Sequence, residues 1–483
     1  MRTILLCFLS LYLLAGAIPA LAEPESEIDL LRAELKQMRA DYEARIADLE
    51  RRLDTAEQTA AVPQTTTVQA PGTATATADA YQPAPSIGQP AMTGGGAFNP
   101  DIGVILQGMA WSYDHDPEEY QIPGFPLSGH AELAPEGLSL GEAEINISAN
   151  VDDKFTAWLT VPIHVHEGDT EVEIEEAWIE TLALPAGLSL RMGRFMSNIG
   201  YLNSKHPHSW DFADQALPYQ AFLGTHYLDD GLQLRWLAPT DTYLELGGEL
   251  LRGDHYLGGG EGDSGVGAYS LTARTGGDVG FDHSWQAGLS YLHVDAENRP
   301  LGGHAHADEH EEDHDGDEDH EGDEGHEDGP LMFGGDTGLW IADFVWKWAP
   351  NGNWKQRNFV FQAEYLLRNE DGFYTMPDAD VLPWDVNQSG WYVQAVYQPF
   401  PRWRFGMRYD RLSSDNPGAA FADSILMPGS DDPQRYSFMT DWSNSEFSRL
   451  RLQYTLDKTS HEDDNQWGLQ YIFSIGAHGA HSF

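Results

Sequence analysis

The chain has 483 residues, a formal net charge of −50 at pH 7 and one cysteine, with 15 Trp, 20 Tyr, 20 Phe and 49 Gly. Such a negative charge excludes a nucleic-acid partner, because phosphates are bound by Lys and Arg, and it favours cationic partners. No stretch after the N-terminal region has the roughly 18 consecutive apolar residues that a membrane helix needs, so the aromatic and glycine content favours a β-protein, either soluble or a membrane barrel.

Residues 1–22 have the organisation of a secretory signal peptide. Arg2 precedes a short apolar run, and the small residues at 20 and 22 form a cleavage site that makes Glu23 the expected mature start. The only cysteine, Cys7, lies inside this segment. The mature chain is therefore expected to contain neither a disulfide nor a thiolate metal site.

Residues 23–58 are predicted to form a coiled-coil helix. Apolar side chains recur every three or four residues from Ile28 to Leu53, and most of the positions between them are charged or Ala. The alternative is a single amphipathic helix that lies on another domain. We favour the coiled coil, which implies an oligomer. Residues 59–97, rich in Thr, Ala and Pro, follow as an extended linker.

From residue 98 onward apolar and polar residues alternate, which is the period of β-strands. About sixteen strands are predicted, most of them about 9 to 14 residues long, the length at which a tilted strand crosses a bilayer. Their connections alternate between short turns and longer loops, as in outer-membrane barrels, whose turns face the periplasm. Among the outer connections, 167–170 and 458–465 are short exceptions.

The expected fold is therefore all-β: a transmembrane antiparallel β-barrel of about 16 strands over residues 98–483, after the coiled-coil helix and the linker. The alternative is a large soluble β-sandwich. Such a sandwich would not need outward apolar rows such as the alternate residues from Phe155 to Val165. The C-terminus agrees with a barrel, because alternating apolar residues end there on Phe483, which resembles the outer-membrane insertion signal.

Several stretches of the barrel region resemble one family. They include "FNPDIGVILQG", "EEAWIETLALPAGLSLRMGRF", "IGYLNSKHPHSWDFAD" and "GAHGAHSF". They look like coiled-coil-bearing outer-membrane porins related to phosphate-selective and siderophore porins, in a subgroup linked with zinc supply. The resemblance implies a porin in the outer membrane of a Gram-negative bacterium, expected as a homotrimer with its coil in the periplasm. That subgroup is sometimes labelled TonB-dependent, but coil and linker at 23–97 are too short for a receptor plug.

The most unusual stretch is 304–328, "HAHADEHEEDHDGDEDHEGDEGHED", with six histidines and fourteen carboxylates. The strand order places it in an outer loop at 297–336. Imidazole and carboxylate suit Zn²⁺, Ni²⁺ or Cu²⁺, and the irregular histidine spacing predicts several weak, exchanging sites. The alternative is a solvated acidic loop. The candidate ligands are His304, His306, His310, His314, His320 and His326.

The stretch "KHPHSWDFAD" at 205–214 lies in the third outer loop. In general porins that loop folds into the lumen, and by analogy His206, His208 and Asp211, with Asp214, would hold a metal at the constriction. The alternative is a loop fixed by Trp210 and capped by its aspartates.

The alternation also assigns charged residues to the lumen. An acidic, histidine-bearing wall would raise the local cation concentration, whereas a basic sector could set a transverse field or bind an anionic chelator. The alternative is a generic polar lumen. The acidic and histidine positions are Glu142, Glu144, His164, His166, Glu171 and Glu173, and the basic ones are Arg404, Arg408, Arg449 and Arg451.

The sequence contains no nucleophile motif and no Gly-rich phosphate loop, so we do not expect an enzyme. No cofactor is expected beyond Zn²⁺ as a bound or transported ion. The expected function is passive uptake of divalent metal, zinc above all, by an outer-membrane porin with an external metal-capturing loop. The alternatives are a porin for small anionic or chelated solutes, or a non-conducting surface metal-binding protein.

Overall fold

The computed structural model describes residues 100–476 except 129–130, 167–168, 260–264, 302–330, 377–379 and 423. The signal peptide, the coiled coil and the linker lie outside the described residues, and so do the six histidines from His304 to His326. These predictions stay predictions.

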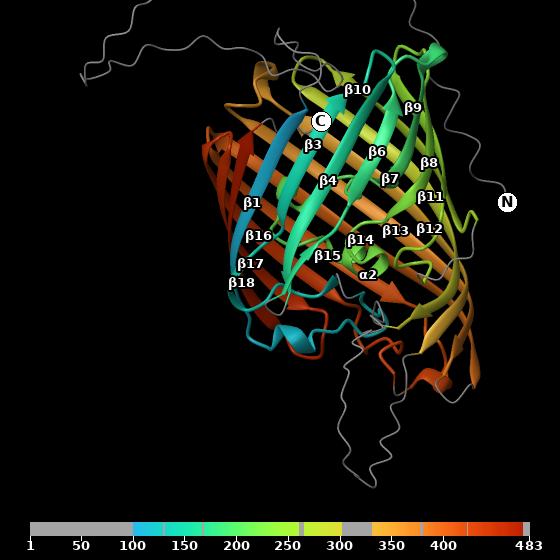
Figure 1. Ribbon diagram of the computed structural model, residues 1–483. Coiled ribbons are helices and arrows are strands. Elements are labelled where there is room, and N and C mark those ends of the chain that lie inside the picture. Colours follow the sequence, from blue (N-terminus) through green and yellow to red (C-terminus); the bar gives the residue numbers. More distant parts are fainter. Residues whose placement is uncertain are drawn as a thin grey trace, which may run out of the picture. The chain divides into compact units, whose positions relative to one another are not determined.

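The described residues form a closed antiparallel β-barrel (Figure 1). Eighteen strand segments pair in ring order, and β18 closes the ring on β1. Segments β2 and β3 both pair with β1, and β5 and β6 both pair with β4, so each couple is one interrupted strand. The barrel therefore has sixteen strand positions, which confirms the predicted number.

Consecutive segments are neighbours in the ring, and the longest of them are β11 to β14. The strands are β1 (Asp101–Ser112), β2 (Gly137–Leu140), β3 (Ala143–Asn150), β4 (Phe155–His166), β5 (Asp169–Val172), β6 (Glu176–Thr181), β7 (Leu188–Met196), β8 (Leu228–Leu237), β9 (Tyr243–Leu251), β10 (Ala268–Val279), β11 (His283–Pro300), β12 (Met332–Trp348), β13 (Asn358–Thr375), β14 (Val381–Phe400), β15 (Trp403–Ser414), β16 (Gln434–Ser445), β17 (Ser448–Lys458) and β18 (Asp464–Gly476). The helices are α2 (Leu217–Leu223) and the short 3₁₀ turns η1 (Pro117–Glu119), η3 (Pro185–Gly187), η4 (Pro207–Ser209), η5 (Pro350–Gly352) and η6 (Ala419–Phe421).

The two faces of the strands have opposite chemistry. On β17 and β18 the buried, inward positions carry polar residues such as Arg451, Gln453 and Gln470. The alternate, outward positions carry apolar residues such as Leu469 and Tyr471, each 44% exposed. A soluble β-sandwich would bury its apolar rows, so this arrangement is that of a barrel whose outer surface faces lipid.

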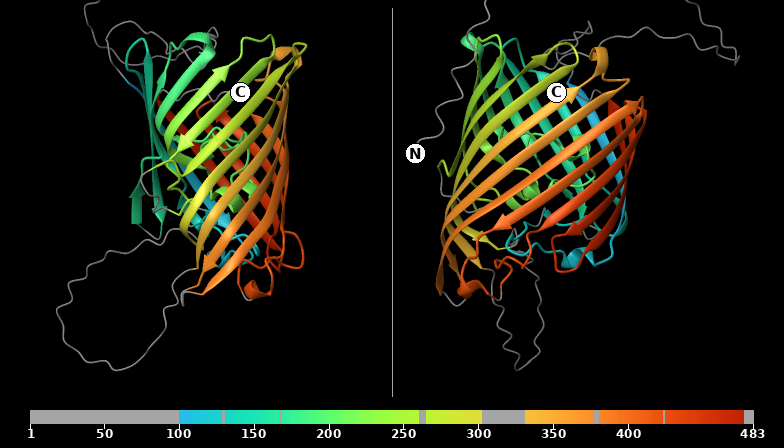
Figure 2. Two further views of the ribbon diagram at one scale, coloured as in Figure 1. Left: turned by 90° about the vertical axis from the view of Figure 1, so that its right-hand side faces the viewer. Right: turned by 180° about the vertical axis from the view of Figure 1, so that it is seen from behind.

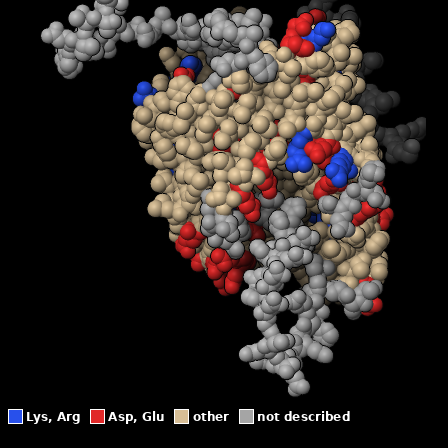
Figure 3. Space-filling model, viewed as in Figure 1, with Lys and Arg blue, Asp and Glu red and all other residues tan. Residues whose placement is uncertain are grey.

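Outward aromatic side chains lie near both ends of the apolar band. On β11 and β12 the rings of Tyr291 and Trp340 are 4.7 Å apart, and towards the other end of β12 and β13 those of Trp346 and Phe359 are 5.6 Å apart. Such girdles mark the two membrane interfaces of transmembrane barrels. In the view of Figure 3 most of the described surface between the ends is uncharged.

The connections alternate as predicted, with short turns at one end of the barrel and long connections at the other (Figure 1). Strands β11 to β14 extend further on the side of the long connections (Figure 2). The predicted outer loop at 369–387 is instead mostly strand, since β13 runs to Thr375 and β14 begins at Val381. The reason is that these polar segments lie beyond the membrane, where the apolar alternation that signals a strand is no longer required.

Residues 197–227 connect β7 to β8, and we call them the lumen loop. All residues of its helix α2 are buried, and α2 packs against β14 and β15. Its Phe222 belongs to an apolar cluster with wall residues such as Ile341 and Leu412. The apolar core of the barrel therefore lies inside it, between this loop and the wall. Among the described residues no helix has the length and apolar composition needed to cross a membrane.

Candidate functional site

The lumen loop is closed at its neck by one asparagine. The Asn203 side-chain amide donates to the carbonyl oxygens of Ser197 and Tyr227 at 2.8 and 2.9 Å. The Tyr227 amide in turn donates to Asn203 Oδ1 at 2.7 Å. Because Asn203 is fully buried, these three bonds fix where the loop leaves and rejoins the wall.

Carboxylates of the wall accept hydrogen bonds from the backbone of the lumen loop. Glu364 of β13 accepts from the amides of Tyr201 and Leu202 at 2.9 and 3.0 Å. Asp410 of β15 accepts from the amide of Leu217 at 2.9 Å, at the start of α2, where the N-cap residue supplies no side-chain bond. The first amides of a helix need such acceptors, so the wall determines the position of the loop.

Two arginines of β15 bind the carboxylates of the lumen loop. Arg404 lies 2.7 Å from Asp211 Oδ1, and Arg408 lies 2.9 Å from Asp214 Oδ2. Arg435 of β16, which the sequence analysis did not single out, lies 3.4 Å from the same Asp214 oxygen. Burial alone would raise the pKa of Asp214, but Arg408 and Arg435 outweigh it and hold that pKa below its usual value.

Two arginines of β17 bind the loop backbone instead. Arg449 donates to the carbonyl oxygen of His208 at 2.7 Å, and Arg451 donates to that of Trp210 at 2.8 Å. The Arg451 side chain is fully buried, and its guanidinium also lies 2.8 Å from Asp441. The inward arginines thus hold the lumen loop in place; their predicted action on solutes stays a prediction.

On another sector of the wall the lumen loop places two imidazoles against glutamates. The rings of His206 and His208 are stacked, with centroids 5.7 Å apart. His208 Nδ1 lies 2.9 Å from Glu144 Oε2, and His206 lies 3.2 Å from both Glu175 Oε2 and Glu176 Oε2. We call this group, together with the neighbouring Glu142, the acid–histidine cluster: Glu142, Glu144, Glu175, Glu176, His206 and His208.

The acid–histidine cluster has four carboxyl groups against two imidazoles, in a buried place. Burial alone would lower the pKa of His206, but Glu175 and Glu144 outweigh it and raise that pKa well above its usual value. Within the described part of the chain, Glu144 Oε2 and Glu175 Oε2 are buried without a hydrogen bond of normal geometry. Imidazole and carboxylate are zinc ligands, so the cluster could hold a divalent cation that replaces the His206 proton.

The structure separates the residues of the metal site that the sequence predicts at 205–214 into two groups. His206 and His208 join Glu144 in the cluster, whereas Asp211 turns to Arg404 and accepts from Gln394 at 3.2 Å. The two halves of "KHPHSWDFAD" therefore bind different sectors of the wall.

The outer part of the predicted funnel is more open. His164 and Glu171 are cross-strand partners of β4 and β5, and Glu171 and Glu173 are exposed. The backbone of His166 lies at the end of β4, and its side chain is outside the described set. Within the part of the chain that the structure describes, His164, Glu171 and Glu173 form no ion pair with the acid–histidine cluster.

The sequence analysis missed Glu175 and Glu176, the nearest partners of His206. A signal for them exists in "EVEIEEAWIE", where two adjacent glutamates break the alternation. The structure interrupts the strand there, between β5 and β6, so that both side chains are buried. A doubled polar residue within an alternating strand predicts such an irregularity.

Comparison with known proteins gives one relative in sequence. An uncharacterized protein of Aquifex aeolicus (strain VF5) is 31% identical over 415 residues, which cover 80% of each chain. No family model matches the chain.

Solved structures resemble the chain at low identity. They include a loop-deletion mutant of the outer membrane protein OmpT of Vibrio cholerae (TM-score 0.46, 10% identity, 78% of this chain and 99% of that one). Others are the outer membrane channel DcaP of Acinetobacter baumannii (0.46, 12%, 78% and 97%) and an anion-selective porin of Comamonas acidovorans (0.46, 8%, 78% and 99%). At these values the fold assignment rests on the strand pairing of the chain itself.

Proposed function

We propose, for a chain that belongs to the same family as the uncharacterized Aquifex aeolicus protein, that it is a passive outer-membrane channel for divalent metal ions, with zinc as the main solute. The observation that carries this proposal is the acid–histidine cluster, which a loop inside the barrel lumen builds against the wall. An ion that passes the lumen loop would meet this cluster.

The charges of the lumen support a cation as the solute. Arg404 and Arg408 are paired with aspartates of the lumen loop, so their charge is balanced locally. In the acid–histidine cluster the acidic groups outnumber the imidazoles, and a low-dielectric wall strengthens their attraction for a cation. Imidazole ligands favour Zn²⁺ over Ca²⁺ and Mg²⁺, which prefer oxygen.

One observation favours the second candidate, a channel for small anionic or chelated solutes. Lys205 of the lumen loop interacts electrostatically with Arg274 and Lys347 of the wall, as well as with Asp211. Burial and, after it, Arg274 lower the pKa of the Lys205 ammonium. Basic side chains that repel one another inside a barrel would attract an anion.

The remaining features of the proposal concern assembly. We place the barrel in the outer membrane of a Gram-negative bacterium as a homotrimer, with the coiled coil of residues 23–58 in the periplasm. The histidine-rich stretch at 304–328 would capture metal outside the cell. The protein would act as a channel and not as an enzyme.

Electrophysiology tests the proposal on the purified protein in a planar bilayer. In a KCl gradient the reversal potential should have the sign of a cation-selective channel, and micromolar Zn²⁺ should reduce the K⁺ current by occupying the cluster. Anion selectivity would support the second candidate, and a protein that does not conduct would contradict both.

Isosteric substitutions that remove charge test whether the zinc block arises at the acid–histidine cluster. Glu175→Gln with Glu176→Gln removes two charges from the cluster and should weaken the zinc block at least tenfold. Glu180→Gln is the control, because Glu180 lies on β6, as Glu176 does, but pairs with Arg191 and Arg235 outside the cluster. Equal zinc block in both variants would overturn the assignment of the cluster.

A further inference from the structure

Four aspartates form a row on the outer face of the barrel wall. Asp295 of β11 is the direct cross-strand partner of Asp336 of β12, which in turn is the partner of Asp371 of β13. Asp371 is the partner of Asp385 of β14. All four side chains are exposed, and we call them the aspartate row.

Such a row costs free energy unless a cation lies on it. Like charges directly opposite each other on neighbouring strands are destabilising. In the part of the chain that the structure describes, neither Lys nor Arg forms an ion pair with the aspartate row. The nearby Arg299 points inward and is bound to Glu370 at 2.7 Å.

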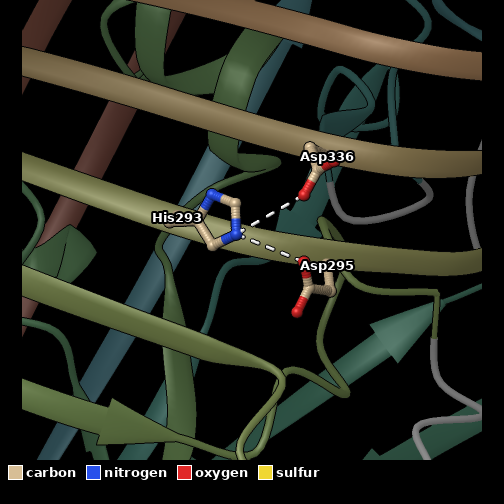
Figure 4. Close-up of side chains that lie close together, drawn as sticks. All are labelled: His293, Asp295 and Asp336. Atoms are coloured by element: carbon tan, nitrogen blue, oxygen red, sulfur yellow. Dashed lines mark hydrogen bonds and ion pairs between the residues drawn. The ribbon is translucent and has the colours of Figure 1, made fainter.

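One histidine stands at the end of the aspartate row (Figure 4). His293 Nε2 lies 3.2 Å from Asp295 Oδ1 and 3.6 Å from Asp336 Oδ1, and the three ligand atoms lie within 4.8 Å of one another. One ring nitrogen thus faces two carboxylate oxygens. A single N–H can satisfy one of them, whereas a metal ion would bind all three atoms at once.

The wall is hollowed beside His293. Gly338 is its cross-strand partner on β12, and the hollow of about 420 Å³ is lined by His293, Asp336, Gly338, Trp340, Asn369 and Asp371, among others. A Cβ atom at position 338 would come within 3.3 Å of the Tyr291 hydroxyl. The glycine therefore keeps open a space in which an ion can complete its coordination with water.

The order of residues along β11 shows where this site lies relative to the membrane. The outward positions run from Leu289 through the aromatic Tyr291 to His293 and Asp295, from apolar to acidic. The site therefore lies just beyond the aromatic girdle, on the side of the long connections, where a transmembrane barrel leaves the lipid.

We infer that His293, Asp295 and Asp336 bind a divalent cation on the outer surface of the barrel, and that Asp371 and Asp385 extend its negative field. The imidazole gives the site a preference for Zn²⁺ over Ca²⁺ and Mg²⁺. The ion joins β11 to β12 by neutralising their facing carboxylates. This inference goes beyond the proposed channel, because the site faces away from the lumen and needs no transport.

Calorimetric titration with ZnCl₂ tests the site on the full chain in detergent. The background is a chain in which the six histidines between His304 and His326 are replaced by Ser, so that their binding does not mask the site. In this background His293→Ala should remove one zinc equivalent or weaken it at least tenfold, while the response to CaCl₂ changes less than twofold. His283→Ala is the control, since His283 is stacked on Trp346 near the turn end of the barrel.

Thermal unfolding gives a second readout that keeps the test decisive. Without metal, Asp336→Asn should unfold at a higher temperature than the parent chain, because the substitution removes the electrostatic repulsion between this residue and the aspartates on its two neighbouring strands. With ZnCl₂ the parent should gain more stability than Asp336→Asn, because the variant keeps only the zinc binding of the acid–histidine cluster. Zinc binding by His293→Ala with parental number and affinity would overturn the inference. The bilayer reversal potential of His293→Ala should equal that of the parent, whatever the outcome for the channel.

Discussion

Single charged residues inside the barrel act through their partners. The alternation of the sequence predicts that Glu144, Arg404 and Arg408 face inward, and the structure places them there. It could not predict what each one binds, because Asp211, Asp214 and the two histidines come from a loop whose path depends on the whole wall. A two-residue period assigns a face and does not identify a contact.

Asp214 gives a prediction about pH. Its pKa is lowered in the folded protein, so its contribution to stability is present above the usual aspartate pKa of about 3.9 and is lost as the pH falls through the folded value. The lumen loop should therefore stay fixed at neutral pH and loosen only in stronger acid. Single-channel recordings should show increased current noise below about pH 4.

The isosteric variant Asp214→Asn supplies the comparison. It removes the charge that Arg408 and Arg435 share, so it should show at pH 7 the noise that the parent shows in acid. Arg411→Gln is the control, because Arg411 pairs with Asp432 away from the loop. If the current noise of Asp214→Asn at pH 7 equals that of the parent, this carboxylate does not hold the loop.

At the scale of elements, the sequence predicts strands well where they cross the membrane and less well beyond it. The sixteen positions follow from apolar alternation, which lipid enforces. The interruptions between β2 and β3 and between β5 and β6 were not predicted, nor was the outward extension of β13 and β14. In these places lumen contacts or water, and not lipid, determine the conformation. The aspartate row lies in such an extension, so its register was visible only in the structure.

The lumen loop gives a prediction at this scale. Glu364→Gln replaces an acceptor of two backbone amides and of the Tyr219 hydroxyl, which lies 2.9 Å away. An amide has one acceptor oxygen and places an NH₂ against the remaining donor, which should cost about 1 to 3 kcal/mol at this buried position. We expect faster proteolysis within 197–227 while the barrel stays folded. Gln107→Ala, also a buried wall residue but on β1, should leave that rate unchanged; equal rates in both variants would mean that Glu364 does not anchor the loop.

At the scale of the whole molecule, the proposed function requires that ions cross the barrel without an energised partner. The lumen loop is bound to the wall at several points, from Glu364, which accepts from the amides of residues 201 and 202, to Asp410 at α2, and the loop is therefore held in place inside the barrel. Purified protein in liposomes should admit Zn²⁺ to an internal fluorescent indicator down its gradient, without a proton gradient or ATP. The initial rate should rise with external zinc and then saturate, because an ion held at the acid–histidine cluster delays the next one.

The variants of the cluster test the cause of this saturation. Glu175→Gln with Glu176→Gln should raise the half-saturating zinc concentration, and Glu180→Gln should not. Liposomes that stay impermeable to zinc while cells take it up through this protein only when their inner membrane is energised would refute passive transport.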